Sequence, residues 1–246
     1  MYALIGVGKT YGDSPVLKNI SCEIPLDGLV TIMGPSGSGK STLLRLLSFL
    51  EAPDVGDLRL QIGQRRFESR GADQPWPMVT LVFQRQFLWP HLTLRENIAL
   101  PLRAARRPNI EAKLRTVVDV FDMSSFVDRF PNEVSAGQAQ RGALARAFVL
   151  DPQLVLLDEA HFGLDLEQQK ILNDHLIALR DSGVALIVVT HSLDFARRYA
   201  ERVVVVEDGT ISEIGSKSIL NQPRSAYLRR ATGLSQFGDT TSPQRC

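Results

Sequence analysis

Residues 34 to 42, Gly34-Pro35-Ser36-Gly37-Ser38-Gly39-Lys40-Ser41-Thr42, have the form G-x-x-x-x-G-K-S of a phosphate-binding P-loop. The apolar run before them, 29–33, predicts a buried strand, and the run 41–47 after them predicts a helix. Glycines let the backbone turn tightly, so that its N–H groups and the helix N-terminus face phosphate oxygens. We expect Lys40 to reach the β- and γ-phosphates and the Ser41 hydroxyl to bind Mg²⁺. The alternative, an ordinary Gly/Ser loop, is disfavoured because strand, loop, Lys-Ser and helix follow in the order that phosphate binding needs.

Composition and charge narrow the class of protein. The chain has 246 residues, 44% of them hydrophobic, and a formal net charge of +1, which gives no general attraction to nucleic acid or anionic membranes. Its two cysteines, Cys22 and Cys246, are far apart and form neither a disulfide framework nor a zinc pattern, so we expect a reducing cytosol. The N-terminus lacks the features of a signal peptide, and apolar runs such as 184–189 are too short to cross a bilayer. We therefore expect the protein not to cross a membrane itself, although it could sit on one through a partner.

The order of apolar and amphipathic runs predicts an α/β fold. Expected strands are 2–7, 21–24, 58–62, 78–83, 154–157, 184–189 and 203–206, with a turn-rich segment at 9–15. Expected helices are 94–100 after the N-cap Thr93, 110–121, 138–149, 166–182 and 192–200. Near-continuous apolar strands that alternate with helices are typical of a parallel sheet covered on both faces. The tail 233–246 is polar, with Gly, Ser and Pro, and is expected to be flexible.

Two acids follow the apolar run 154–157. Ligands of open α/β sheets sit at the carboxyl ends of the strands, where Asp158 would hold Mg²⁺ and Glu159 would act as general base toward water. The alternative is a solvated helix cap, which the upstream P-loop disfavours. His191 and Gln84 also follow predicted strands, and they are placed to reach a γ-phosphate and a metal ion or water respectively. Taken alone, each is a weak signal.

Two further segments stay undecided on residue chemistry alone. Ser135 is a good N-cap for a helix whose first residues are small, so the segment is either an anion site or a simple capped helix. Tyr11 lies beside Gly12 in a loop, where it is either a stacking partner for a nucleotide base or an ordinary surface tyrosine; composition favours the latter.

Together these motifs resemble one family, the ATP-binding-cassette (ABC) ATPases, over about residues 1–230. The matching segments keep the order of that family: Tyr11, the Walker A motif 34–42, Gln84, the signature 134–138, the Walker B motif 154–159, a D-loop ending in Asp165, and His191. The resemblance implies a P-loop core with a mostly parallel sheet, an N-terminal antiparallel β subdomain and an inserted helical subdomain. It implies one ABC domain over 1–232, with 1–84 and 151–232 as nucleotide-binding core and 85–150 as helical subdomain.

The resemblance also implies a mechanism. Two chains would face each other head to tail, and Ser135, Gly137 and Gln138 would serve the nucleotide held by the partner's Walker A motif. Tyr11 would stack on adenine, which reverses the preference from composition. Glu159 would activate water and His191 would orient the γ-phosphate. Gln84 would begin the loop that senses a transmembrane partner.

The segment 84–102 is similar to that of bacterial importers, particularly the branch for polar amino acids. Its aromatic-rich part would form part of the groove for a permease helix, or a hydrophobic cap on the helical subdomain. The implied partners are a second identical subunit, a permease and a solute-binding protein, with no nucleic acid. The implied location is the cytoplasmic face of the inner membrane.

Three positions depart from the family pattern. Ala136 stands where glycine is common in the signature, which puts the efficiency of that phosphate site in question. Phe162 replaces a D-loop serine that serves communication across the dimer, and His161 lies beside Glu159 with no role that we can assign.

Other classes of P-loop protein fit less well. A soluble ABC-type protein acting on DNA or the ribosome is the main alternative, but the chain lacks an inserted coiled coil and a second cassette. The signature and His191 argue against a P-loop kinase or GTPase. We therefore predict an ATPase subunit of a transporter, with ATP and Mg²⁺ as cofactors and an amino acid or similar small molecule as solute.

Overall fold

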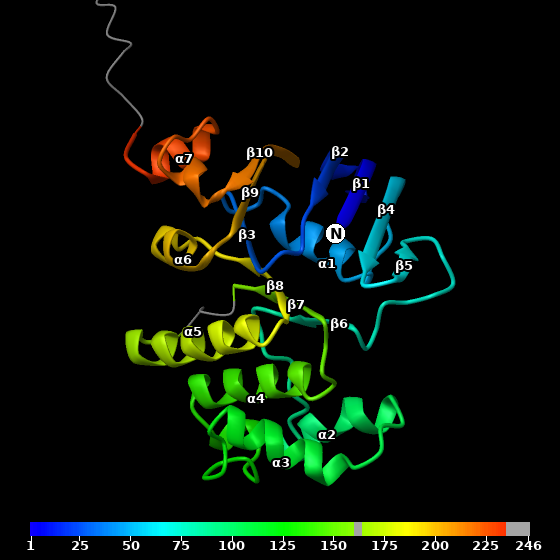
Figure 1. The fold of residues 1–246 in the computed structure, drawn as a ribbon, viewed down its shortest axis with the longest axis vertical. Helices are drawn as coiled ribbons and strands as arrows, with labels where there is room; N and C mark the ends of the chain where they lie inside the picture. The colour runs from blue at the N-terminus through cyan, green and yellow to red at the C-terminus, as the bar shows by residue number, and fades with distance from the viewer. Residues whose placement is uncertain (160–163, 235–246) are drawn as a thin grey trace, which may run out of the picture.

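A computed structural model describes residues 1–159 and 164–234 and shows two sheets and a set of helices (Figure 1). In Figure 1 the smaller sheet lies at the upper right beside the helix α1, the larger sheet runs from β10 near the top to β6 at mid-height, and the helices α2, α3 and α4 lie at the bottom. The predicted fold class is confirmed: a mostly parallel sheet carries an antiparallel N-terminal sheet and an inserted group of helices.

The larger sheet has the strand order β10-β9-β3-β8-β7-β6. All neighbouring pairs are parallel except β9 and β10, which form an antiparallel hairpin. The strands are β3 (Leu29–Met33), β6 (Val79–Val82), β7 (Leu154–Asp158), β8 (Ala185–Val189), β9 (Arg202–Glu207) and β10 (Thr210–Ser216). Because the parallel strands run the same way, the polar residues that follow β3, β6, β7 and β8 all lie at one end of this sheet.

The smaller sheet is antiparallel, with the order β2-β1-β4-β5. Its strands are β1 (Tyr2–Tyr11), β2 (Ser14–Ile24), β4 (Val55–Ile62) and β5 (Arg65–Glu68). The prediction of a turn-rich segment over 9–15 was wrong, because only Gly12 and Asp13 lie between the two strands. Pro15, which suggested a turn, lies in the edge strand β2, where the missing N–H costs less than it would in a central strand.

The helices follow the predicted pattern closely. They are α1 (Lys40–Leu47), α2 (Leu94–Ala104), α3 (Ile110–Val120), α4 (Ala136–Phe148), α5 (Leu166–Asp181), α6 (Leu193–Tyr199) and α7 (Ala226–Ala231), with 3-10 turns at Pro131–Glu133 and Lys217–Leu220. Thr93 is the N-cap of α2 as expected: its hydroxyl accepts from the Glu96 N–H, and the Glu96 carboxylate accepts from the Thr93 N–H. The helix α7 was not foreseen.

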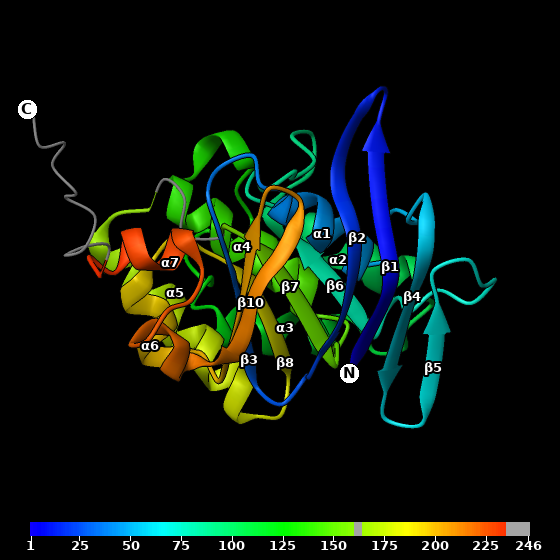
Figure 2. The ribbon, with the colours of Figure 1, turned by 90° about the horizontal axis from the view of Figure 1, so that it is seen from above.

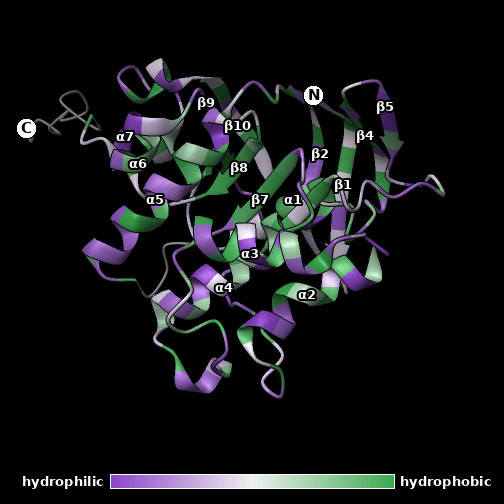
Figure 3. Ribbon diagram, turned by 60° about the horizontal axis from the view of Figure 1, so that its bottom comes forward, coloured by the Kyte–Doolittle hydropathy of each residue, from purple (hydrophilic) through white to green (hydrophobic). Residues whose placement is uncertain are grey.

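Two hydrophobic cores cover the two faces of the larger sheet, and alternate residues of each strand belong to different cores. In β7, Val155 and Leu157 pack with the helices α2 to α6, whereas Leu154 and Leu156 pack with α1 and the smaller sheet. Figure 2 shows the smaller sheet on one side of the larger one and α5 and α6 on the other, and Figure 3 shows β7 and β8 as hydrophobic strands between them. This double burial explains why the central strands are apolar throughout.

Within the described ranges, no helix has both the length and the apolar character needed to span a bilayer. From residue 235 on, the predicted flexible tail lies outside the described residues.

Candidate functional site

The P-loop lies between the end of β3 and the start of α1. Gly34, Gly37 and Gly39 all have positive φ angles, 152°, 78° and 101°. A Cβ at Gly34 would lie 2.0 Å from the Val206 carbonyl oxygen, so no larger residue fits there without a backbone shift. Gly39 is the N-cap of α1 and supplies no side-chain cap, which leaves the first N–H groups of the helix available to an anion.

Lys40 is buried in this loop and folds back onto it. Its Nζ donates to the carbonyl oxygens of Gly34, at 3.0 Å, and Pro35, at 2.7 Å. Burial lowers the pKa of this ammonium group, and the charges of Glu159 and Asp158 partly oppose that shift. The ammonium group is therefore held at the mouth of the loop by carbonyl oxygens that a phosphate would replace.

The first acid after β7 is bonded to the P-loop helix. The Ser41 hydroxyl donates to the Asp158 carboxylate at 3.2 Å. Asp158 is 9% exposed, and burial is the main cause that raises its pKa. Asp158 and Ser41, two of the three predicted metal ligands, are thus brought into contact. Gln84, the third, contacts the second acid, Glu159.

The second acid, Glu159, is held by two side chains from neighbouring strands. Gln84 Nε2, after β6, donates to its Oε2 at 3.1 Å, and His191 Nε2, after β8, lies 2.9 Å from its Oε1. Glu159 has a φ of +46°, a left-handed conformation that is unfavourable for a residue with a Cβ and occurs most often at functional sites. Its N–H donates to the Val189 carbonyl, which pins this conformation to β8.

Six predicted residues therefore meet at one end of the larger sheet. We call this end the P-loop edge and define it by Lys40, Ser41, Gln84, Asp158–Glu159 and His191. These residues come from four strand ends that are up to 151 positions apart in sequence (Lys40 to His191), and hydrogen bonds join several of them directly. The arrangement can hold phosphate oxygens, a hard cation and a water molecule beside a carboxylate.

The signature lies elsewhere, at the start of α4. The Ser135 hydroxyl accepts from the Gln138 N–H, and the Gln138 side chain accepts from the Ser135 N–H. A Cβ at Gly137 would lie 2.7 Å from the Gln168 side chain, so α4 approaches α5 closely there. In the part of the chain that the structure describes, no hydrogen bond or ion pair joins these residues to the P-loop edge. The structure therefore does not bring the predicted signature residues to the P-loop of the same chain.

Tyr11 lies at the end of β1, with 40% of its surface exposed. Its hydroxyl donates to the Glu51 carboxylate, and the Lys9 ammonium lies 5.6 Å from the centre of its ring. Of the D-loop, Asp165 caps α5 through the Gln168 N–H. The departures His161 and Phe162 lie outside the described residues.

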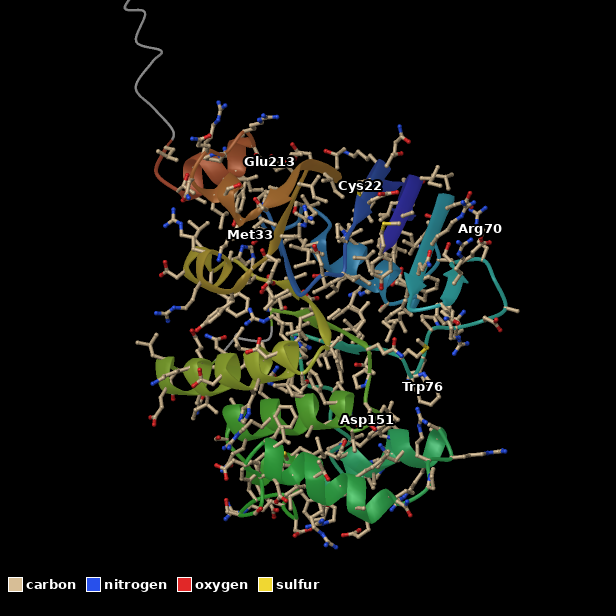
Figure 4. All side chains as sticks on the ribbon, in the orientation of Figure 1. Cys22, Met33, Arg70, Trp76, Asp151 and Glu213 are labelled. Atoms are coloured by element: carbon tan, nitrogen blue, oxygen red, sulfur yellow. The ribbon has the colours of Figure 1, made fainter. Side chains whose placement is uncertain are left out.

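Two features near Gln84 were missed by sequence reasoning. The first is Arg146, whose guanidinium donates at 2.9 Å to both the Gln86 and Phe87 carbonyls and so ties the loop after Gln84 to α4. The only signal was an arginine among alanines on a helix. The second is Trp76, exposed beside the helices in Figure 4, in the connection between β5 and β6. Its Pro-Trp-Pro context was a signal for an exposed aromatic.

Trp76 borders an apolar groove of about 420 Å³ between the connection that follows α1, the connection between β5 and β6, the strand β6 with Phe83 after it, and α4. The groove is lined by apolar residues of these elements, among them Phe49, Leu50, Trp76, Phe83 and Ala147. A second apolar groove, of about 600 Å³, lies along α3 and includes no residue of the P-loop edge or the signature.

A parallel sheet with a P-loop after one strand, an aspartate at the end of another strand and a hydroxyl beside that aspartate defines a P-loop nucleotide triphosphatase. The model of the ABC transporter family matches residues 17–161, more than half of the chain. The chain belongs to the ABC transporter family, and it is an ATPase of that family.

Named relatives agree with this family. The chain is 38% identical to a sulfate/thiosulfate import ATP-binding protein of Vibrio vulnificus, over 94% of this chain and 68% of that protein. It is also 38% identical to a spermidine/putrescine import ATP-binding protein of Nitratidesulfovibrio vulgaris, over 94% of this chain and 62% of that protein. The chain thus spans about two thirds of the length of these relatives.

Solved structures with the same fold are ABC cassettes. The dimeric structure of the bacterial ABC transporter cassette MJ0796 aligns with a TM-score of 0.78 and 32% identity, over 88% of this chain and 99% of that one. A post-hydrolysis dimer of MJ0796 bound to ADP and Pi aligns with a TM-score of 0.77 and 30% identity.

Proposed function

We propose that this chain is the ATP-hydrolysing subunit of a solute importer and works as a dimer with two shared nucleotide sites. The observation that carries the proposal is the contact of Glu159 with both Gln84 and His191, beside a P-loop in the same chain. A carboxylate in that place can accept a proton from an attacking water, while the histidine orients the phosphate under attack.

The remaining residues have defined roles in this proposal. The backbone of residues 34–42 binds the phosphates, Lys40 neutralises their charge, and Tyr11 stacks on the adenine. Mg²⁺ fits the donor set, because a hydroxyl, a carboxylate and an amide offer the oxygen ligands it prefers, from Ser41, Asp158 and Gln84. Asp158 is also buried, and a nearby cation would offset the cost of burying the carboxylate charge. When bound, the ion would neutralise charge that develops on the transferred phosphoryl group.

The signature supports the proposal of a second subunit. Ser135, Gly137 and Gln138 start a helix at which a phosphate would be favourable, yet in the described residues no hydrogen bond or ion pair joins them to the P-loop of their own chain. A second copy placed head to tail would bring them to its nucleotide. Both MJ0796 structures are dimeric, which agrees with this arrangement.

The partner in the membrane is a permease that inserts a helix into the groove bordered by Trp76 and Phe83. We place the ATPase on the cytoplasmic face, and a solute-binding protein completes the importer. The relatives are named for sulfate or thiosulfate and for polyamines, so we propose a small solute of one of these classes. The expected amino acid substrate finds no support among these relatives, and no observation favours a role on DNA or the ribosome.

Replacement of Glu159 tests the proposal. Glu159→Gln should keep ATP affinity but slow turnover by at least ~10²-fold, the usual cost of losing a general base, and ATP should then trap a dimer. Steady-state hydrolysis, nucleotide titration and size-exclusion chromatography with ATP measure the three effects. Near-normal turnover would exclude the role assigned to Glu159.

A pull-down tests the transporter role separately. The tagged protein, isolated from its native cell in mild detergent, should bring down a multi-span permease whose kind identifies the solute. Recovery of ribosomes or DNA-associated proteins without a membrane protein would contradict the importer role and leave the ATPase chemistry intact.

A further inference from the structure

The hydroxyl of Tyr11 is hydrogen-bonded to a residue just beyond the C-terminal end of the P-loop helix. Tyr11 ends β1, and its phenol donates to the carboxylate of Glu51, in the connection between α1 and β4. The Glu51 N–H donates to the Arg45 carbonyl in the last turn of α1, and Glu51 Oε1 lies 3.7 Å from the Arg45 guanidinium. One side chain therefore joins the tip of the smaller sheet to the helix that begins at Lys40.

A cation covers one face of the Tyr11 ring. The Lys9 Nζ lies 5.6 Å from the ring centre and donates at 3.0 Å to both Asp54 Oδ1 and the Ala52 carbonyl. The ammonium group is thus held by the same connection that carries Glu51. With one face of the ring occupied by a cation, the opposite face remains for a planar group.

The backbone of β1 near its end is tied to this connection as well. The Thr10 N–H donates to Asp54 Oδ2 at 2.7 Å, and the Asp54 N–H donates to the Gly8 carbonyl at 2.9 Å. These bonds, with the Lys9 ammonium, hold the pKa of Asp54 below its usual range. Backbone and ring are therefore held separately, the backbone by Asp54 and the ring by Glu51.

Apart from its bond to the Tyr11 phenol, the Glu51 carboxylate makes only weak contacts in the described residues. The carboxylate lies 3.9 Å from the Lys9 ammonium and 3.7 Å from the Arg45 guanidinium. Among the described residues, the only hydrogen bond of this carboxylate is with the Tyr11 phenol. Ion pairs that are this long and still partly open to solvent stabilise a fold very little. A fixed aromatic ring, by contrast, loses less conformational freedom when a base stacks on it.

We propose that Glu51 is a positioning residue for the nucleotide base: it holds the Tyr11 phenol so that the open face of the ring lies at a set distance from the P-loop. The eight-residue helix α1 sets this distance, because Lys40 begins the helix and Glu51 lies just beyond its end. This inference rests on the proposed stacking of Tyr11 on adenine.

The test compares two ligands that share phosphates and differ in the base. Calorimetric titration of the full chain with Mg²⁺-ATP and with Mg²⁺-tripolyphosphate separates base binding from phosphate binding. Glu51→Ala should weaken ATP binding about five-fold, the effect of one hydrogen bond, and leave tripolyphosphate binding unchanged. Tyr11→Phe keeps the ring but loses the hydroxyl, and it should show the same loss.

Three further variants complete the design. The double variant Glu51→Ala/Tyr11→Phe should lose no more than either single variant, because both remove the same contact. Glu51→Gln keeps an acceptor oxygen and should bind ATP nearly as the wild type does. Glu68→Ala, which removes a paired glutamate in β5 of the same sheet, is the matched control and should change neither ligand.

Equal weakening of both ligands by Glu51→Ala would overturn the proposal, because Glu51 would then act through α1 and the P-loop. Unchanged ATP affinity in Glu51→Ala and Tyr11→Phe would also overturn it. Tyr11→Ala tests the stacking role of the ring separately from the positioning role of Glu51. It should weaken ATP binding by about five-fold to a hundred-fold if the ring stacks on the base. If Tyr11→Ala has no effect, the stacking role itself fails; if only Tyr11→Ala has an effect, Glu51 alone loses its role.

Discussion

The P-loop edge and the signature are built in opposite ways. At the P-loop edge, side chains from four strand ends bond to one another, as Ser41 does with Asp158 and Gln84 does with Glu159. At the signature, the side-chain hydrogen bonds of Ser135 and Gln138 within ranges 1–159 and 164–234 stay inside their own first helical turn. One region is assembled by the tertiary fold, and the other is a local helix start.

The difference is what we expect if two chains share each nucleotide site, as proposed above. At the P-loop edge, which includes the buried Lys40 and Asp158, polar side chains from different strands satisfy one another. The signature residues Ser135 and Gln138 cap their own helix and, among the described residues, form no side-chain hydrogen bond to the P-loop edge. This agrees with the proposed role toward a second copy. Substitutions in the two regions should therefore lower different quantities: ATP affinity of the monomer at the P-loop edge, and turnover at the signature.

The largest effect is expected from loss of the P-loop lysine. Lys40→Ala removes the charge that faces the phosphates, so ATP affinity should fall by about ten-fold to a hundred-fold, as for a charged hydrogen bond. Titration calorimetry measures this loss in the monomer. Lys18→Ala, on exposed β2, is the control, and equal losses in both variants would contradict the P-loop assignment.

A smaller and different effect is expected from the signature. Ser135→Ala should leave ATP affinity of the monomer unchanged but lower turnover roughly ten-fold, because the partner's phosphate loses one hydrogen bond and part of its alignment. Thr93→Ala is a matched control, since Thr93 caps α2 with the same capping box. Both variants should lose about 1 kcal/mol of stability, and only Ser135→Ala should lose activity. A loss of ATP affinity in the Ser135→Ala monomer would contradict a nucleotide site shared between two chains.

The departure at Ala136 allows a finer comparison. Ala136 is the first residue of α4, so Ala136→Gly should lower the free energy of unfolding by at most about 1 kcal/mol. Urea unfolding measures this cost. Turnover should rise if the alanine restrains the phosphate site, and unchanged turnover would show that the alanine is neutral.

The smallest effect concerns how the signature subdomain is held together. Arg95 in α2 donates to both carboxylate oxygens of Asp128, at 2.6 and 3.1 Å, and this contact lowers the pKa of Asp128. A lowered pKa means that the contribution to stability is present above the ordinary value of about 3.9 and is lost as the pH falls through the folded-state value.

Asp128→Asn should therefore cost at most about 1 kcal/mol at neutral pH, because the pair is largely exposed, and the difference from the wild type should shrink below about pH 4. Urea unfolding across this pH range measures it. Asp119→Asn, an exposed residue in α3, is the control. A difference that grows in acid would contradict the assignment.

Much of the P-loop edge was predictable because each member follows an apolar run in sequence. Asp158 and His191 were recognised from the ends of predicted strands, and parallel strands necessarily bring such ends together. The contacts between Glu159, Gln84 and His191 were not predictable, because they depend on the order of β6, β7 and β8 in the sheet.

Errors arose where local composition competes with sheet pairing. Lys9 to Pro15 has turn-forming residues, but pairing between β1 and β2 extends the strands to within two residues of each other. The positions of Arg146 and Trp76 also depend on neighbours distant in sequence, so local patterns carried only weak signals for them.

The sequence alone determined the chemistry of this protein: a P-loop, two acids after a strand and a signature name the family, because phosphate binding requires those residues at those spacings. Only the tertiary structure decided which motifs meet. It closed the P-loop edge within one chain, left the signature to its own helix, and tied Tyr11 to Glu51. Such contacts join residues far apart in sequence, and their geometry follows from how the two sheets and the helices pack.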